Sequence, residues 1–193
     1  MANGKTALSR CSGFDICFES LMDEEPAYDI AIARVSGDAP GCEAILRSAI
    51  EATLRRHRTP AARISVGLVD DVHMAHLNEL HLNCKGTTDV LSFDLRDAPS
   101  TPTVSNGEPK RVTPGTTDGP VEGEIVLSID TAAREARQRG HTLDAELALY
   151  AVHGTLHLLG YVDRHEPDAA HMHDIEDDIL SGIGLGTVYG ANP

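Results

Sequence analysis

The run Glu146–His165, ELALYAVHGTLHLLGYVDRH, decides the fold of this chain. His153 and His157 lie four residues apart within a nearly continuous apolar segment, and on a helix this spacing puts both side chains on one face. Two imidazoles one turn apart can bind one metal ion. Gly160 follows at a position where a helix can end with a residue at positive φ. The run therefore predicts a central helix that carries half of a metal site, with a turn beyond it.

The segment after Gly160 offers two candidates for a third ligand. Asp163 lies ten positions after His153, and His165 lies twelve positions after it. Either residue would complete a three-ligand site with one position left for water, an arrangement typical of catalytic zinc. Polar groups on so apolar a helix must be hydrogen-bonded or ligated, and the pairing of two histidines favours ligation.

Three stretches resemble a known family. HGTLHLLGY at 153–161 is similar to the signature of the YbeY family, bacterial rRNA maturation factors and single-strand-specific endoribonucleases. TDVLSF at 88–93 and GEIVLSID at 123–130 resemble two further family blocks, in the family's order. The family signature usually continues GYDH, with its third histidine ten positions after the first, whereas this chain reads GYVDRH. Asp163 occupies that position, and a two-residue insertion after Tyr161 would put His165 there instead.

The resemblance implies a function and its partners. It implies a zinc-dependent (Zn2+) endoribonuclease that processes the 3′ end of small-subunit rRNA and serves ribosome quality control. The implied partners are single-stranded RNA, including rRNA, and the ribosome or its small subunit; neither DNA nor a membrane is expected. The TDVLSF strand would lie beside the metal cleft, so Asp89 and Ser92 join His153 and His157 as candidate catalytic residues. Asp89 is equally well interpreted as a capping carboxylate at the start of the strand.

Two rival functions remain open. One is a ribosome-binding factor in which zinc only stabilises the turn and no catalysis occurs. The other is a metallopeptidase or amidohydrolase, which is disfavoured because Gly154 stands where peptidases of the HExxH type carry a glutamate base. Without that glutamate, the metal itself would have to acidify a water molecule and polarise a phosphoryl oxygen.

Composition and charge bound these hypotheses. A chain of 193 residues with 41% hydrophobic residues suits one domain. The formal net charge of −14 counts against nucleic acid, because affinity for a phosphate backbone normally comes from Lys and Arg. A local basic region could still guide phosphate toward a metal. It comprises Arg47, Arg55, Arg56, Arg58 and Arg63. Family members commonly carry an arginine shortly before the TDVLSF block, where Lys85 is the only nearby cation here.

Cysteine usage and the termini point to the cytoplasm. The four cysteines form no CxxC pair, which favours free thiols in a reducing compartment. Residues 1–10 contain no apolar targeting segment, and no run approaches the length that spans a bilayer.

The fold expected is α+β and zincin-like, with the histidine helix packed on a four-stranded mixed sheet. Periodicity predicts strands at 28–35, 63–69, 88–95 and 123–130 and helices between and after them. The resemblance implies three parallel strands with 88–95 antiparallel. We expect a poorly ordered leader at 1–27, one domain at 28–182 with a long surface loop at 96–120, and a tail at 183–193. In the helices, Leu80 is expected to face inward and Glu176 to face water.

Overall fold

The computed structural model describes residues 27–38, 41–96, 114–115 and 119–189 of the chain. The leader predicted for residues 1–27 therefore lies outside the described residues except for Ala27, which begins the first strand. Most of the surface loop predicted for 96–120 also lies outside them.

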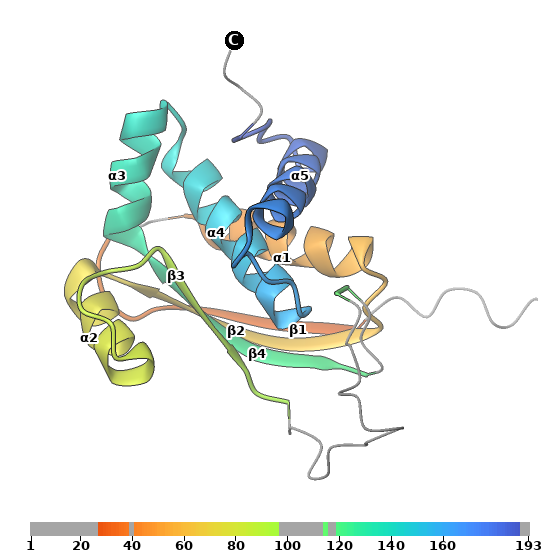
Figure 1. Cartoon of the computed structure of the whole chain (residues 1–193), viewed down its shortest axis with the longest axis horizontal. Coiled ribbons are helices and arrows are strands. Elements are labelled where there is room, and N and C mark those ends of the chain that lie inside the picture. The colour runs from red at the N-terminus through yellow and green to blue at the C-terminus, as the bar shows by residue number, and fades with distance from the viewer. Residues whose placement is uncertain (1–26, 39–40, 97–113, 116–118, 190–193) are drawn as a thin grey trace, which may run out of the picture.

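The sheet has four strands in the order β1-β2-β4-β3. They are β1 (Ala27–Arg34), β2 (Ala61–Val69), β3 (Val90–Asp94) and β4 (Val121–Ser128). β1, β2 and β4 run parallel, and β3 pairs antiparallel with β4 at the edge of the sheet (Figure 1). The α+β class and the mixed sheet expected from the sequence are confirmed.

Five helices accompany the sheet. They are α1 (Glu43–Arg56), α2 (Asp71–Leu82), α3 (Ile129–Arg139), α4 (Leu143–Leu158) and α5 (Glu166–Gly182). α1, α4 and α5 lie over one face of the sheet, and α2 lies on the other (Figure 1). Polar side chains start three of the helices, because a capping oxygen accepts a hydrogen bond from an otherwise unpaired backbone N–H. Asp70 caps α2, Ser128 caps α3 and Thr142 caps α4.

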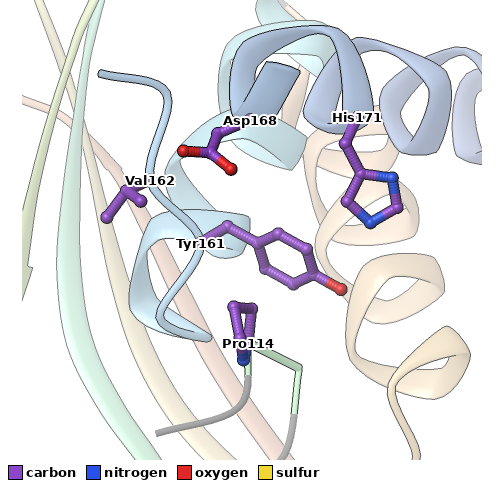
Figure 2. Close-up of a pocket in the computed structure, with 5 residues that line it drawn as sticks. All are labelled: Pro114, Tyr161, Val162, Asp168 and His171. Carbon is purple, nitrogen blue, oxygen red and sulfur yellow. The ribbon is translucent and has the colours of Figure 1, made fainter. Parts of the chain in front are cut away.

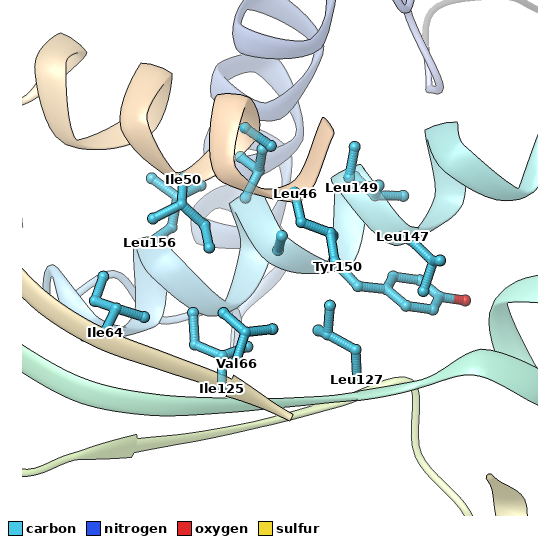
Figure 3. Packing of buried hydrophobic residues seen from close by; sticks show 14 of the residues in the cluster. Leu46, Ile50, Ile64, Val66, Ile125, Leu127, Leu147, Leu149, Tyr150 and Leu156 are labelled. Atoms are coloured by element: carbon cyan, nitrogen blue, oxygen red, sulfur yellow. The ribbon is translucent and has the colours of Figure 1, made fainter. Parts of the chain in front are cut away.

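The main core lies between the sheet and the α1/α4 layer. α4 is buried around most of its circumference, which explains its nearly continuous apolar sequence. Figure 3 shows Leu46 and Ile50 of α1 meeting Leu156 of α4 above Ile64 and Ile125 of the sheet. A smaller cluster under α2 consists of Val69, Met74, Leu91 and Val126.

Two glycines let α4 approach the sheet closely. A Cβ atom on Gly123 of β4 would lie 2.6 Å from Cδ1 of Leu158. A Cβ atom on Gly154 of α4 would lie 2.9 Å from both Cγ2 of Ile125 and Oγ of Ser92. Because real Cβ atoms do not come this close to other atoms, only glycine allows this packing. The histidine helix is therefore held directly against β4 and the edge strand β3.

Helix α2 departs from the sequence expectation at Leu80. Met74 is fully buried, but Leu80 is 65% exposed, so its expected inward orientation is wrong. The polar side chain of Asn78 takes part of the buried face instead and donates to the carbonyl of Gly86 at 2.9 Å. α2 covers only one end of the open sheet face, which is why an apolar residue near its end stays in solvent.

The chain after α5 folds back against that helix. The backbone N–H groups of Val188 and Tyr189 donate to Oδ1 of Asp177 at 2.6 and 3.1 Å. The ring of Tyr189 stacks on that of His173 with 3.8 Å between centroids. The described part of the predicted tail, residues 183–189, is therefore packed on the domain. Within the described ranges, every helix is too short or too polar to cross a membrane.

Candidate metal centre

Three side chains converge at the end of α4. His153 and His157 leave the helix one turn apart, and their Nε2 atoms are 2.9 Å from each other. Oδ2 of Asp163 lies 3.7 Å from Nε2 of His153. One ligand atom from each residue fits within 4.8 Å of the others, so this group could hold a metal ion. No other such group of three or more His, Cys, Asp or Glu side chains occurs in the described part of the chain.

The turn that carries Asp163 forms because Gly160 ends the helix. Its φ of 86° lies in the left-handed region, which glycine adopts without a Cβ penalty. The Gly160 N–H donates to the carbonyl of His157 at 2.9 Å, and the Tyr161 N–H donates to that of Leu156 at 3.0 Å. These bonds reverse the chain and bring Asp163 back toward the histidines.

The other ring nitrogens fix the tautomers of both histidines. Nδ1 of His157 lies 3.0 Å from the carbonyl oxygen of Tyr161, which can only accept, so Nδ1 carries the proton. Nδ1 of His153 lies 2.7 Å from Oε1 of Glu176 and is oriented in the same way. Both Nε2 atoms then face one point, which a shared proton or a metal ion can occupy. Two imidazole nitrogens and a carboxylate oxygen are ligands that Zn2+ accepts, so the residues fit a zinc ion.

Glu176 is the functional residue that sequence reasoning placed wrongly. The expectation that it faces water is wrong, because Glu176 is 0% exposed. It lies four residues after Met172 and three before Ile179, both of which are buried. That spacing puts it on the apolar stripe of α5, and a charged residue at a core position needs a partner. The helical phase was the signal that could have identified it as a partner of the histidine site.

The electrostatic surroundings of the site favour a cation. Burial on its own lowers the pKa of His153, but the hydrogen bond and charge of Glu176, with the charges of Asp89 and Asp163, raise it overall. Burial and the neighbouring Glu176 carboxylate likewise raise the pKa of Tyr189. Three carboxylates thus act on His153, and a bound divalent ion would offset their charge.

The structure separates His165 from this group. His165 is exposed and stands at the N-terminus of α5, where its side chain makes no capping hydrogen bond. Its backbone carbonyl accepts from the N–H groups of Asp168 and Ala169. Of the two candidates for a third ligand, Asp163 is the one in the group that could hold a metal ion.

Asp89 and Ser92 lie near the site without entering the group. Oδ1 of Asp89 accepts from the N–H of Val90 at 2.9 Å and from Oγ1 of Thr88 at 3.0 Å, the geometry of a capping carboxylate. Oγ of Ser92 is buried beneath Gly154 and has no hydrogen-bond partner among the described residues. Asp89 acts on His153 through its charge, and Ser92 lines the contact between β3 and α4.

Two arginines of the predicted basic region are paired with carboxylates. Nη2 of Arg56 lies 2.9 Å from Oδ2 of Asp178, and Nη1 of Arg63 lies 3.5 Å from Oε1 of Glu122. Arg47 donates to a backbone carbonyl of β1 at 2.8 Å. Another cation, at the start of the predicted surface loop, lies closer to α4.

That cation is Arg96, which bonds the end of α4 to the end of β3. Its Nη2 donates to the carbonyl of Leu158 at 2.7 Å and to Oδ2 of Asp94 at 2.6 Å. A cation at a helix C-terminus is favourable because the last carbonyls are otherwise unpaired.

The fold and the site together define an α+β protein with a candidate metal centre of the kind that metal-dependent hydrolases use. Residues 32–184 match the family described as Endoribonuclease YbeY. The chain therefore belongs to the endoribonuclease YbeY family, a family of nuclease hydrolases.

Individual relatives agree with this membership. The endoribonuclease YbeY of Parvibaculum lavamentivorans is 34% identical over 166 residues, covering 85% of this chain and 86% of the relative. That of Rhizobium meliloti is 34% identical over 86% of this chain and 98% of the relative. That of Moorella thermoacetica is 40% identical over 64% and 74%, respectively. The solution structure of a Thermotoga maritima protein superposes with a TM-score of 0.50 at 18% identity, covering 85% of this chain and 99% of that one, and supports the fold.

Proposed function

We propose that this protein is a zinc-dependent endoribonuclease that cleaves single-stranded RNA, with one Zn2+ held by His153, His157 and Asp163. The observation that supports it most is the convergence of three ligand atoms within 4.8 Å in a member of a nuclease family. Three protein ligands leave a tetrahedral ion one position for solvent, as catalytic sites require. The Asp163 side chain is 44% exposed, so solvent and substrate can reach this side of the site.

The residues of the chain divide the work at this site. A bound zinc ion would supply the acidification of a water molecule and the polarisation of a phosphoryl oxygen. Glu176 holds the ring of His153, and the Tyr161 carbonyl holds that of His157, so both ligands are oriented before the ion binds. Asp89 contributes negative charge that favours a cation.

The edge strand β3 suits an extended substrate in a zincin-like arrangement. It runs beside α4 at the edge of the sheet, so an RNA strand laid along it would pass the metal centre. The Ser92 side chain lies against Gly154 and would keep β3 and α4 in contact. A phosphate group of this RNA strand would then lie next to the ion.

The cellular role proposed is processing of the 3′ end of small-subunit rRNA and ribosome quality control in the cytoplasm. It is supported by family membership, because the curated relatives are named as endoribonucleases. The partners would be rRNA and the small ribosomal subunit.

Chelation tests the proposed activity. Purified protein is incubated with end-labelled single-stranded RNA in the presence of Zn2+, with EDTA, and with EDTA followed by excess Zn2+. We expect cleavage in the first and third samples only, and none by the variant His157→Ala. Equal cleavage with and without EDTA would contradict metal dependence, and absence of cleavage in all samples would contradict the nuclease activity.

A ribosome-binding factor with a purely structural zinc ion is the second candidate. It is favoured by one observation, that Asp163 lies in the turn between α4 and α5, which an ion could pin. His157→Ala separates the two, because loss of a structural ion lowers the melting temperature sharply, whereas loss of a catalytic ion mainly abolishes cleavage. A metallopeptidase is disfavoured because Gly154 faces Ser92 and Ile125 at distances that leave no room for a glutamate.

A further inference from the structure

A pocket of about 330 Å3 lies beside the metal centre at the end of α4. It is lined by Pro114, Tyr161, Val162, Asp168 and His171. Figure 2 shows the Tyr161 ring in the middle of these residues, with Pro114 on one side of it and Asp168 and His171 of α5 on the other. The pocket thus combines an aromatic ring and two apolar side chains with one carboxylate and one imidazole.

The pocket shares neighbouring residues with the candidate metal centre. The carbonyl of Tyr161 accepts from Nδ1 of His157, and Val162 directly precedes Asp163. A group seated in the pocket would therefore lie next to the residues that hold the ion.

The Tyr161 ring is held at its hydroxyl end. Its hydroxyl lies 3.1 Å from Nε2 of His57, whose Nδ1 lies 2.7 Å from the carbonyl of Thr53. Since a carbonyl only accepts, Nδ1 carries the proton, and Nε2 accepts from the Tyr161 hydroxyl. The hydroxyl is thus occupied, and what Tyr161 offers a ligand is the surface of its ring. The His171 ring is 6.1 Å away and tilted by 41°.

We propose that this pocket binds one nucleobase of the single-stranded RNA, which stacks on Tyr161 and donates a hydrogen bond to the carboxylate of Asp168. The inference rests on the proposed function. Proteins recognise unpaired bases in this way, with an aromatic ring against the base and polar groups on its edge. An aromatic ring beside a carboxylate, in a pocket next to the candidate metal centre, suits a base of the RNA.

The carboxylate gives the pocket a preference among bases. An ionised Asp168 only accepts hydrogen bonds, so it matches the exocyclic amino groups of cytosine, adenine and guanine. Uracil presents a carbonyl oxygen where cytosine presents its amino group, so in the same pose it offers Asp168 an acceptor in place of a donor. The pocket should therefore favour an amino-bearing base over uracil at one position of the substrate.

Paired substrates test this preference. RNAs of one sequence are made with cytosine or uracil at each position around the cleavage site, and kcat/KM is measured for every pair. At one position we expect uracil to lower kcat/KM by about 5- to 150-fold, the discrimination that corresponds to one good base contact. Asp168→Asn should remove this difference because an amide both donates and accepts. Tyr161→Ala should slow both substrates.

The matched control is Glu166→Gln. Glu166 is an exposed acid in the same first turn of α5 and does not line the pocket, so its replacement removes an equal charge at the same helix end. The control should keep the cytosine preference. Equal rates for cytosine and uracil at every position, or an Asp168→Asn variant that discriminates like the wild type, would overturn the proposal.

A binding measurement separates this inference from the proposed nuclease activity. Cytidine and uridine are titrated into the protein with EDTA present, and the NMR signals of the Val162 methyl groups and the His171 ring are followed. Cytidine should shift these signals at lower concentration than uridine even if no RNA is cleaved. That result would support the base pocket and contradict the nuclease activity. Cleavage without base preference and without cytidine-induced shifts would contradict base binding in the pocket and leave the proposed nuclease activity unaffected.

Discussion

Oε1 of Glu176 lies 2.7 Å from Nδ1 of His153, so a fully buried carboxylate on α5 fixes an imidazole that α4 directs to the candidate metal centre. Glu176→Gln keeps the shape of the side chain and removes its charge. We expect the affinity for Zn2+ to fall by about 10- to 100-fold, as is usual when a partner of a metal-bound histidine is changed. Competition with a chelator measures this affinity at fixed pH.

The control for this change is Asp174→Asn. Asp174 is an exposed acid on the same helix, so its loss changes the net charge equally without touching His153. Its zinc affinity should match that of the wild type. If Glu176→Gln also binds zinc as tightly as the wild type, the buried carboxylate does not support the metal site.

The third ligand can be identified by substitution. Asp163→Ala should weaken zinc binding strongly because it removes one of the three converging ligand atoms. His165→Ala should leave binding unchanged, and Asp163→His should retain it because an imidazole is also a zinc ligand. The same chelator competition measures all three variants. The opposite ranking of Asp163→Ala and His165→Ala would assign the ligand to His165.

The close contact of α4 with the sheet predicts an unusual effect of alanine. Gly154→Ala would gain about 0.5–1 kcal/mol from helix propensity, but the new methyl group would meet Ile125 and Ser92 at 2.9 Å. Overpacking of this kind costs about 1–3 kcal/mol, so we expect a net fall in the free energy of unfolding. Gly182→Ala is the control, since nothing lies within 4 Å of its new Cβ.

Denaturant unfolding of both variants, with zinc removed, gives the comparison. Gly182→Ala should be neutral or stabilising by up to about 1 kcal/mol. A Gly154→Ala protein that is more stable than the wild type would show that α4 can move away from β3 without cost.

Much of the fold and half of the site could be predicted from the sequence, because periodicity and spacing are local properties. The pair His153 and His157 follows from helix geometry alone. Spacing favours Asp163 and residue identity favours His165, so the sequence leaves the third ligand open. The path of the turn after Gly160 depends on backbone bonds that no pattern specifies. The acidic run EDD, which begins at Glu176, predicts an exposed side chain there. The composition of that run hides the helical phase that puts Glu176 on the buried face.

The base pocket could not be found from the sequence for a related reason. Tyr161 and His57 are 104 residues apart, and only the packing of α1 beside the turn after α4 brings them together. Arg56 of the basic region likewise meets Asp178, which lies 122 residues further along the chain. Contacts of this kind are set by tertiary packing.

The contact between His57 and Tyr161 predicts a pH-dependent stability. Burial lowers the pKa of His57 below 6.5, the bond to Thr53 raises it in part, and the charge of Arg56 lowers it further. Because the unfolded chain then binds a proton at higher pH than the folded chain, stability is complete above about pH 6.5 and falls as the pH drops toward the folded pKa.

His57→Gln tests this prediction because glutamine donates and accepts but does not titrate. Melting temperatures are measured between pH 7.5 and 5.5 for both proteins, with EDTA present to exclude metal binding. The wild type should lose more stability on acidification than the variant. Parallel curves would mean that His57 does not contribute to the pH dependence.

Anomalous diffraction at the zinc edge, from crystals grown with Zn2+, tests the central claim most directly. We predict one peak per chain, within bonding distance of Nε2 of His153, Nε2 of His157 and a carboxylate oxygen of Asp163, with one coordination position left to solvent. A zinc ion bound elsewhere, an ion enclosed by four protein ligands, or histidine rings that turn to other partners in a zinc-replete crystal would contradict the account.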